Sequence, residues 1–97
     1  MSAEFREDEK RRKQISKDIL EGGYNSQQAF FLLRLNGLKL DRLHPGEYGI
    51  ELSSAAKIRL LDKAIYSTFI DCRELGVGDD ANKILSGYEV VSQKNKI

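Results

Sequence analysis

Apolar residues recur at steps of three and four along much of the chain, which is the spacing of helices that bury one face. The spacing is clearest in one run: Ile58, Leu61, Ile65, Phe69 and Cys72. Ser53 or Ser54 provides an N-cap before this run, and Gly76 follows it, so we expect a helix that ends at Leu75. With 1.5 Å per residue its length is about 33 Å, which spans a small domain.

The first segment, from about Ser2 to Glu21, has a helical pattern whose two halves differ. Residues 6–14 contain no apolar side chain, and acidic residues precede basic ones by four positions, an order that stabilises isolated helices. The second half places Ile15, Ile19 and Leu20 on one stripe. We therefore expect a charged, solvated helical extension over residues 1–14 and packing only from Ile15 onward.

An almost entirely apolar segment, residues 29–35, predicts a second helix at the centre of the fold. Asn25 and Gln28 have the spacing of a capping box, which starts the helix there. Gly37 is expected to end it. The competing interpretation takes Asn36 and Gly37 as the turn of a β-hairpin, although leucine-rich flanks favour helix over strand.

Glycine marks the other expected helix ends, because it adopts the left-handed conformation of the C′ position without a steric penalty. Gly23 and Gly76 are each followed by an apolar residue that can contact the preceding helical turn, as in a Schellman ending. Between residues 38 and 52 the pattern weakens around Pro45-Gly46, which fits a type II turn. A helical turn at 40–43 and an extended piece at 48–52 are both compatible with this stretch.

A short fourth helix is expected to begin at Asp79 or Asp80, where a carboxylate meets the positive end of the helix dipole, and to end at Gly87. It would bury three apolar residues: Ala81, Ile84 and Leu85. The chain is thus predicted to be all-α, a small bundle of three to four helices over residues 15–91, preceded by the charged extension and followed by a mobile polar tail, 92–97.

Composition narrows the classes of function. Sixteen basic and fifteen acidic residues give a formal charge of +1, so no whole-molecule field attracts nucleic acid or an anionic membrane. No apolar run is long enough for a bilayer, and the amino terminus alternates charges where a signal peptide is apolar. We expect a cytoplasmic protein with no membrane association. The single cysteine excludes an internal disulfide and a cysteine-based zinc site.

Residues capable of chemistry do not form recognisable sets. His44 is the only histidine and has no nucleophile or acid at a recognisable spacing, so it is interpreted as a surface imidazole. Cys72 continues the apolar stripe and is expected to be buried. Gly76-Val77-Gly78 lacks the preceding strand and third glycine of a dinucleotide fingerprint. We expect no catalytic residue, no metal site and no cofactor.

The sequence therefore favours a non-catalytic protein, regulatory, adaptor or inhibitor-like, that binds a protein partner through a helical surface, with a homodimer as one form. The candidate contacts are phenylalanines that cannot all face one core and arginines of the first helix. They are Phe5, Arg11, Arg12, Phe30 and Phe31.

The alternative is a small nucleic-acid-binding module. It would use basic residues of the first and third helices: Lys10, Lys13, Lys57, Arg59 and Lys63. The acidic trio Glu7-Asp8-Glu9 weakens this alternative, because it neutralises much of the field of the basic cluster that follows it.

Overall fold

The computed structural model describes residues 3–44 and 54–86, and these residues form four α-helices and no strand. The helices are α1 (Ala3–Leu20), α2 (Ser26–Leu43), α3 (Ser54–Glu74) and α4 (Gly78–Ser86). The predicted all-α bundle is confirmed. The expectations for the extended piece at 48–52 and for the tail at 92–97 lie outside the described residues.

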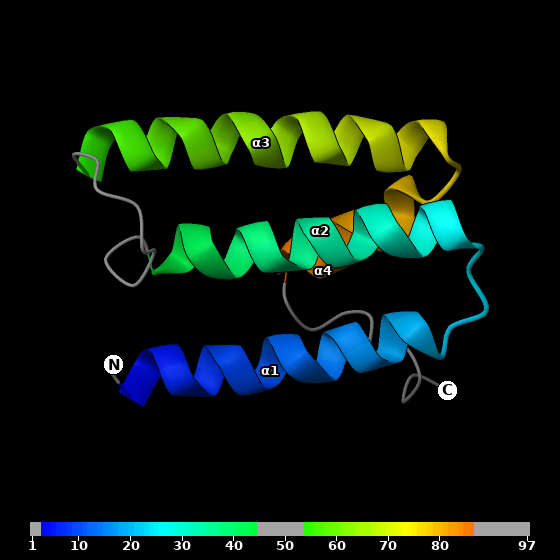
Figure 1. Ribbon diagram of the computed structural model, residues 1–97, viewed down its shortest axis with the longest axis horizontal. Helices are drawn as coiled ribbons and strands as arrows, with labels where there is room; N and C mark the ends of the chain where they lie inside the picture. Colours follow the sequence, from blue (N-terminus) through cyan, green and yellow to red (C-terminus); the bar gives the residue numbers. More distant parts are fainter. Residues whose placement is uncertain (1–2, 45–53, 87–97) are drawn as a thin grey trace.

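Helix α2 is the centre of the fold. Figure 1 shows α1, α2 and α3 side by side in one layer, with α2 in the middle and the short α4 packed behind it. Helix α2 accordingly contacts each of the other three helices, and α4 also contacts α3.

The core forms where α4 packs against the layer. Its buried members are Ile15, Ile19, Leu32, Leu35, Cys72, Val77, Ala81 and Ile84. The predicted burial of Cys72 is confirmed, as is that of Ala81 and Ile84 in α4, while Leu85 is partly buried. In α3, Leu61 is buried, and Ile65 and Phe69 are partly buried against the core.

The start of α2 has the predicted capping box. The Asn25 side chain accepts a hydrogen bond from the Gln28 backbone N–H at 2.9 Å, and the Gln28 Oε1 accepts one from the Asn25 backbone N–H at 3.0 Å. Gln28 also donates through Nε2 to the Leu75 carbonyl at 3.0 Å. One side chain thus caps α2 and ties its first turn to the end of α3.

Two of the predicted glycine endings are also confirmed. Gly23 and Gly76 have φ angles of 80° and 83°, in the left-handed region. After α3, the Val77 N–H bonds to the Cys72 carbonyl at 2.9 Å and the Gly76 N–H to the Arg73 carbonyl at 3.0 Å. These are the two bonds of a Schellman motif, which occupy carbonyls that the helix end leaves without a partner.

The prediction that α2 ends at Gly37 was wrong, and so was the hairpin alternative. Helix α2 continues through Gly37 to Leu43 and includes the helical turn at 40–43. Glycine inside a helix is unfavourable by roughly 1 kcal/mol relative to alanine, a local penalty. Leu35 and Asn36 are buried just before Gly37, and residues 38–42 are partly buried after it, so packing on both sides outweighs the penalty.

The first half of α1 also differs from the predicted solvated extension. Arg12 is only 5% exposed, and Asp8 lies against His44 at the end of α2. The two errors have one cause. Because α2 is longer than predicted and runs antiparallel to α1, its second half offers a surface on which the first half of α1 packs.

Candidate binding surface

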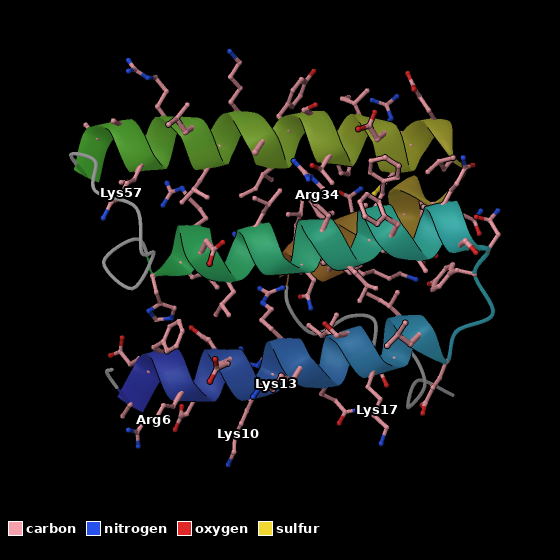
Figure 2. All side chains as sticks on the ribbon, viewed as in Figure 1. Arg6, Lys10, Lys13, Lys17, Arg34 and Lys57 are labelled. Carbon is pink, nitrogen blue, oxygen red and sulfur yellow. The ribbon has the colours of Figure 1, made fainter. Side chains whose placement is uncertain are left out.

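Four basic residues of α1 lie in one line on its solvent-exposed side: Arg6, Lys10, Lys13 and Lys17. We call them the basic edge. Their spacing of four, three and four residues keeps them on one side of the helix over about 16 Å. In Figure 2, Arg6, Lys10 and Lys17 extend from the side of α1 that faces away from α2. The edge is thus open to a partner approaching along α1.

None of the four cations of the basic edge forms an ion pair with a residue that the structure describes. The acidic residues expected to neutralise them are partly directed elsewhere. Asp8, in the middle of the acidic trio, pairs with His44 at 2.6 Å and reaches Arg11 at 3.9 Å. Glu7 and Glu9 remain beside the edge, so it combines a line of positive charge with flanking carboxylates.

Arg12 fixes the orientation of the basic edge from the opposite side of α1. Its Nη1 donates to the Ile84 carbonyl at 2.7 Å and to Asn36 Oδ1 at 3.2 Å. Asn36 Nδ2 in turn donates to the Arg12 carbonyl at 2.8 Å and to Ser16 Oγ at 2.9 Å. Three helices, α1, α2 and α4, therefore meet at one guanidinium.

The Ile84 carbonyl belongs to the last turn of α4, where carbonyls have no partner within the helix and the dipole is negative. The Arg12 guanidinium therefore caps α4 with a positive charge. Burial lowers the pKa of Arg12, while nearby Asp8 raises it and Arg11 lowers it. Lys10 is two residues away, about 200° around the helix, so holding Arg12 inside turns Lys10 outward.

His44 is not the surface imidazole that the sequence suggested. Its side chain is 14% exposed, its Nε2 lies 2.6 Å from Asp8 Oδ2, and the Phe5 ring meets it edge-on with ring centroids 5.3 Å apart. The sequence could not show this cluster, because Asp8 and His44 are 36 positions apart. The two residues that contact the His44 ring, Asp8 and Phe5, carry no nucleophilic hydroxyl or thiol. Both belong to the start of α1, so the cluster joins the start of α1 to the end of α2.

The five predicted partner contacts have different positions. Phe30 is 59% exposed, whereas Phe31 packs partly buried against the core, which confirms that they do not share one core stripe. Arg11 is exposed, and its nearest carboxylate is Asp8. Arg12 is an interior residue, and Phe5 contacts His44. Of the five, Phe30 and Arg11 are therefore the most accessible to a partner.

The predicted nucleic-acid contacts divide between two sides of the molecule. Lys10 and Lys13 belong to the basic edge of α1, while Arg59 and Lys63 are exposed on α3 and Lys57 is half-buried near its start. Helix α2 lies between α1 and α3 (Figure 1), so the two sets belong to helices that are not direct neighbours. The prediction omitted Arg6 and Lys17, which the helical spacing alone could have identified.

Residues with metal-binding or nucleophilic side chains are dispersed. Over residues 3–44 and 54–86, no group of three or more His, Cys, Asp or Glu side chains could hold a metal ion. Burial, together with Asp71, raises the pKa of the Cys72 thiol to about 11, which disfavours the reactive thiolate. No described helix is long and apolar enough to cross a membrane.

Comparison of the chain with protein-family models, with curated proteins and with solved structures finds no match.

Proposed function

We propose that this protein is a non-catalytic, cytoplasmic binding protein, regulatory or adaptor-like, that docks an acidic surface of a partner protein on the basic edge of α1. One observation carries the proposal: four exposed cations stand in line with no ion pair to a described residue. Such a line attracts an acidic surface at long range and aligns it along the helix.

An acidic protein fits this surface better than a nucleic acid does. Duplex DNA carries one negative charge per ~1.7 Å of its axis. Phosphates bound along the edge would lie within the Debye length of about 8 Å from Glu7 and Glu9, which would repel them. A protein surface can place carboxylates opposite the lysines and a few basic groups opposite these glutamates. The charge pattern of α1 therefore favours an acidic protein surface that also carries basic groups.

Exposed apolar side chains can add contact area to such an interface. Leu20 was expected on the packing stripe with Ile15 and Ile19, but it is 68% exposed at the end of α1, because the buried face of the helix ends at Ile19. Phe30 is also exposed, on α2. Association of two copies through these residues is the homodimeric form of the proposal. Light scattering over a concentration series tests it: a monomer at all concentrations removes the homodimer and leaves a different protein as the partner.

A site-specific cross-linking experiment tests the proposed interface. A photoreactive amino acid replaces Lys13 in one version of the protein and Arg59 in a matched control, because both positions are exposed and basic but lie on α1 and α3. We expect a discrete acidic protein to be captured from Lys13 and not from Arg59. The captured protein is then purified and its affinity measured directly.

The affinity measurement uses a double charge reversal on α1, Lys10→Glu with Lys13→Glu. The control makes the same change of charge on α3, Arg59→Glu with Lys63→Glu. Two ion pairs contribute roughly 1–2 kcal/mol, so the α1 variant should bind about 5- to 30-fold more weakly than the control. Equal affinities would overturn the proposal. A 20-base-pair DNA duplex tests the nucleic-acid alternative. If the duplex binds tightly and log K falls against log salt with a slope near −3.6, the value for four phosphate contacts, the nucleic-acid function replaces the proposed one.

A further inference from the structure

The short fourth helix covers only part of the groove between α2 and α3. Helix α4 has 9 residues, whereas α2 has 18 and α3 has 21. Near the end of α4 lies a cleft of about 400 Å³, within the size range of small-molecule pockets. Three helices line it through six residues: Lys39, Arg42, Leu43, Asp62, Ile65 and Leu85.

The lining combines an apolar wall with an excess of positive charge. Leu43, Ile65 and Leu85 come from α2, α3 and α4, so the apolar wall is built from all three helices. The Arg42 Nε donates to Asp62 Oδ1 at 2.7 Å, and this pair neutralises two of the charges. Lys39 forms no ion pair with a described residue. Its ammonium is therefore the cation available to a ligand.

We propose that this cleft binds a small amphiphilic carboxylate, whose head group pairs with Lys39 and whose hydrocarbon part lies against Leu43, Ile65 and Leu85. Among the described residues of the lining, one cation without an ion pair, Lys39, lies beside the Arg42–Asp62 pair. This arrangement suits a monoanion, because a dianion such as a phosphate monoester would meet the Asp62 carboxylate with its second charge. Burial of the hydrocarbon part supplies the attraction, and the lysine selects the charged head. The cleft is separate from the basic edge of α1, so either proposal can fail alone.

The test compares two probes that share a hydrocarbon chain, decanoate and decanol, below the concentration at which either aggregates. Binding is followed by amide chemical shifts in nuclear magnetic resonance spectra of the full chain. Decanoate should bind saturably and shift amides around Lys39, Ile65 and Leu85. Lys39→Gln should weaken decanoate about tenfold and leave decanol unchanged, while Lys57→Gln, a matched change outside the lining, should affect neither probe.

A second variant tests the apolar wall. Leu43 is 43% exposed and lies outside the hydrophobic core, so Leu43→Ala should preserve the fold, which circular dichroism checks. It should weaken both probes, because both lose the same hydrocarbon contact. Any of three results would overturn the proposal. They are no saturable binding of decanoate, binding of decanoate to Lys39→Gln as tight as to the unchanged protein, and amide shifts that are confined to the surface of α1.

Discussion

The two sides of α1 carry similar basic residues that have opposite surroundings. On the inner side, Arg12 is 5% exposed and holds the Ile84 carbonyl and Asn36. On the outer side, Lys10 and Lys13, which belong to the same basic cluster of the sequence, are exposed and have no ion pair with a described residue. The formal charge of a cluster therefore does not say which of its members hold the fold and which remain available for binding.

The difference arises from what lies opposite each residue. Arg12 faces the last turn of α4, whose free carbonyls and negative dipole end attract a guanidinium. Lys10 faces outward, where water solvates its ammonium. Four experiments follow: three measure stability, in order of decreasing expected effect, and the fourth is a titration.

The largest effect is expected for Arg12→Ala. It removes hydrogen bonds from a charged donor and leaves the Ile84 carbonyl and Asn36 Oδ1 to find water, so the free energy of unfolding should fall by about 3 kcal/mol. Urea unfolding followed by circular dichroism measures the loss. The adjacent Arg11→Ala is the control and should change stability by less than about 0.5 kcal/mol. Equal losses would show that the interior contacts of Arg12 contribute nothing beyond those of a surface arginine.

A double-mutant cycle sharpens the same contrast. Arg12 and Asn36 bond to each other in both directions, through Nη1 to Oδ1 and through Nδ2 to the Arg12 carbonyl. Arg12→Ala keeps the backbone carbonyl, so only the Nη1–Oδ1 bond couples the two side chains. Combining Arg12→Ala with Asn36→Ala should give a coupling of about 1–2 kcal/mol in unfolding experiments. The pair Arg11→Ala with Asn36→Ala should be additive to within about 0.5 kcal/mol. Additivity in both cycles would contradict the network at the junction of α1, α2 and α4.

A smaller, stabilising effect is expected on the outer side of α2. Gly37 is exposed within the helix, and a Cβ atom there would meet nothing within 4 Å, so Gly37→Ala should raise the free energy of unfolding by roughly 0.5–1 kcal/mol. Thermal and urea unfolding both report it. The control Gly76→Ala places a side chain at φ 83° and should lower stability instead. A loss of stability in Gly37→Ala would contradict the continuous helix, because it would mean that the backbone at Gly37 is not helical.

The last prediction concerns Tyr24 and pH, and its readout is a titration. Burial and a hydrogen bond to Asp80 raise the pKa of Tyr24 from 10.0 to about 12, so the fold favours the neutral phenol. The stabilisation is complete below pH 10 and is lost as pH rises from 10 to about 12, where the folded form also ionises. Tyrosinate absorbance should show a late titration step that Tyr24→Phe removes. The exposed Tyr66→Phe is the control and should leave that step in place.

Much of the fold was predictable because its signals act over a few residues. The structure confirms three such signals, each of which involves positions within about one or two helical turns. They are the capping box of Asn25 and Gln28, the left-handed Gly76 and the apolar stripe around Cys72. The basic edge was predictable in part. Lys10 and Lys13 were identified from a cluster in the sequence, while Arg6 and Lys17 require the helical spacing to be followed over three turns.

The remaining features depend on segments far apart in the chain. Whether α2 stops at Gly37 depends on the partners of residues 38–43, since a local penalty of about 1 kcal/mol is smaller than the packing gained on both sides. The cleft beside Leu85 is lined by residues of α2, α3 and α4, which are far apart in the chain, and no local pattern encodes that arrangement.

The amino-acid sequence by itself determined where helices form, how most of them begin and end, and which residues can face a core, because these properties follow from backbone geometry and neighbours along the chain. Only the tertiary structure decided that Arg12 is interior, that Asp8 meets His44 and that Lys10 faces solvent. A charged side chain is buried only where another segment supplies hydrogen-bond partners to replace water, and the residues that supply them here lie at least 24 positions away.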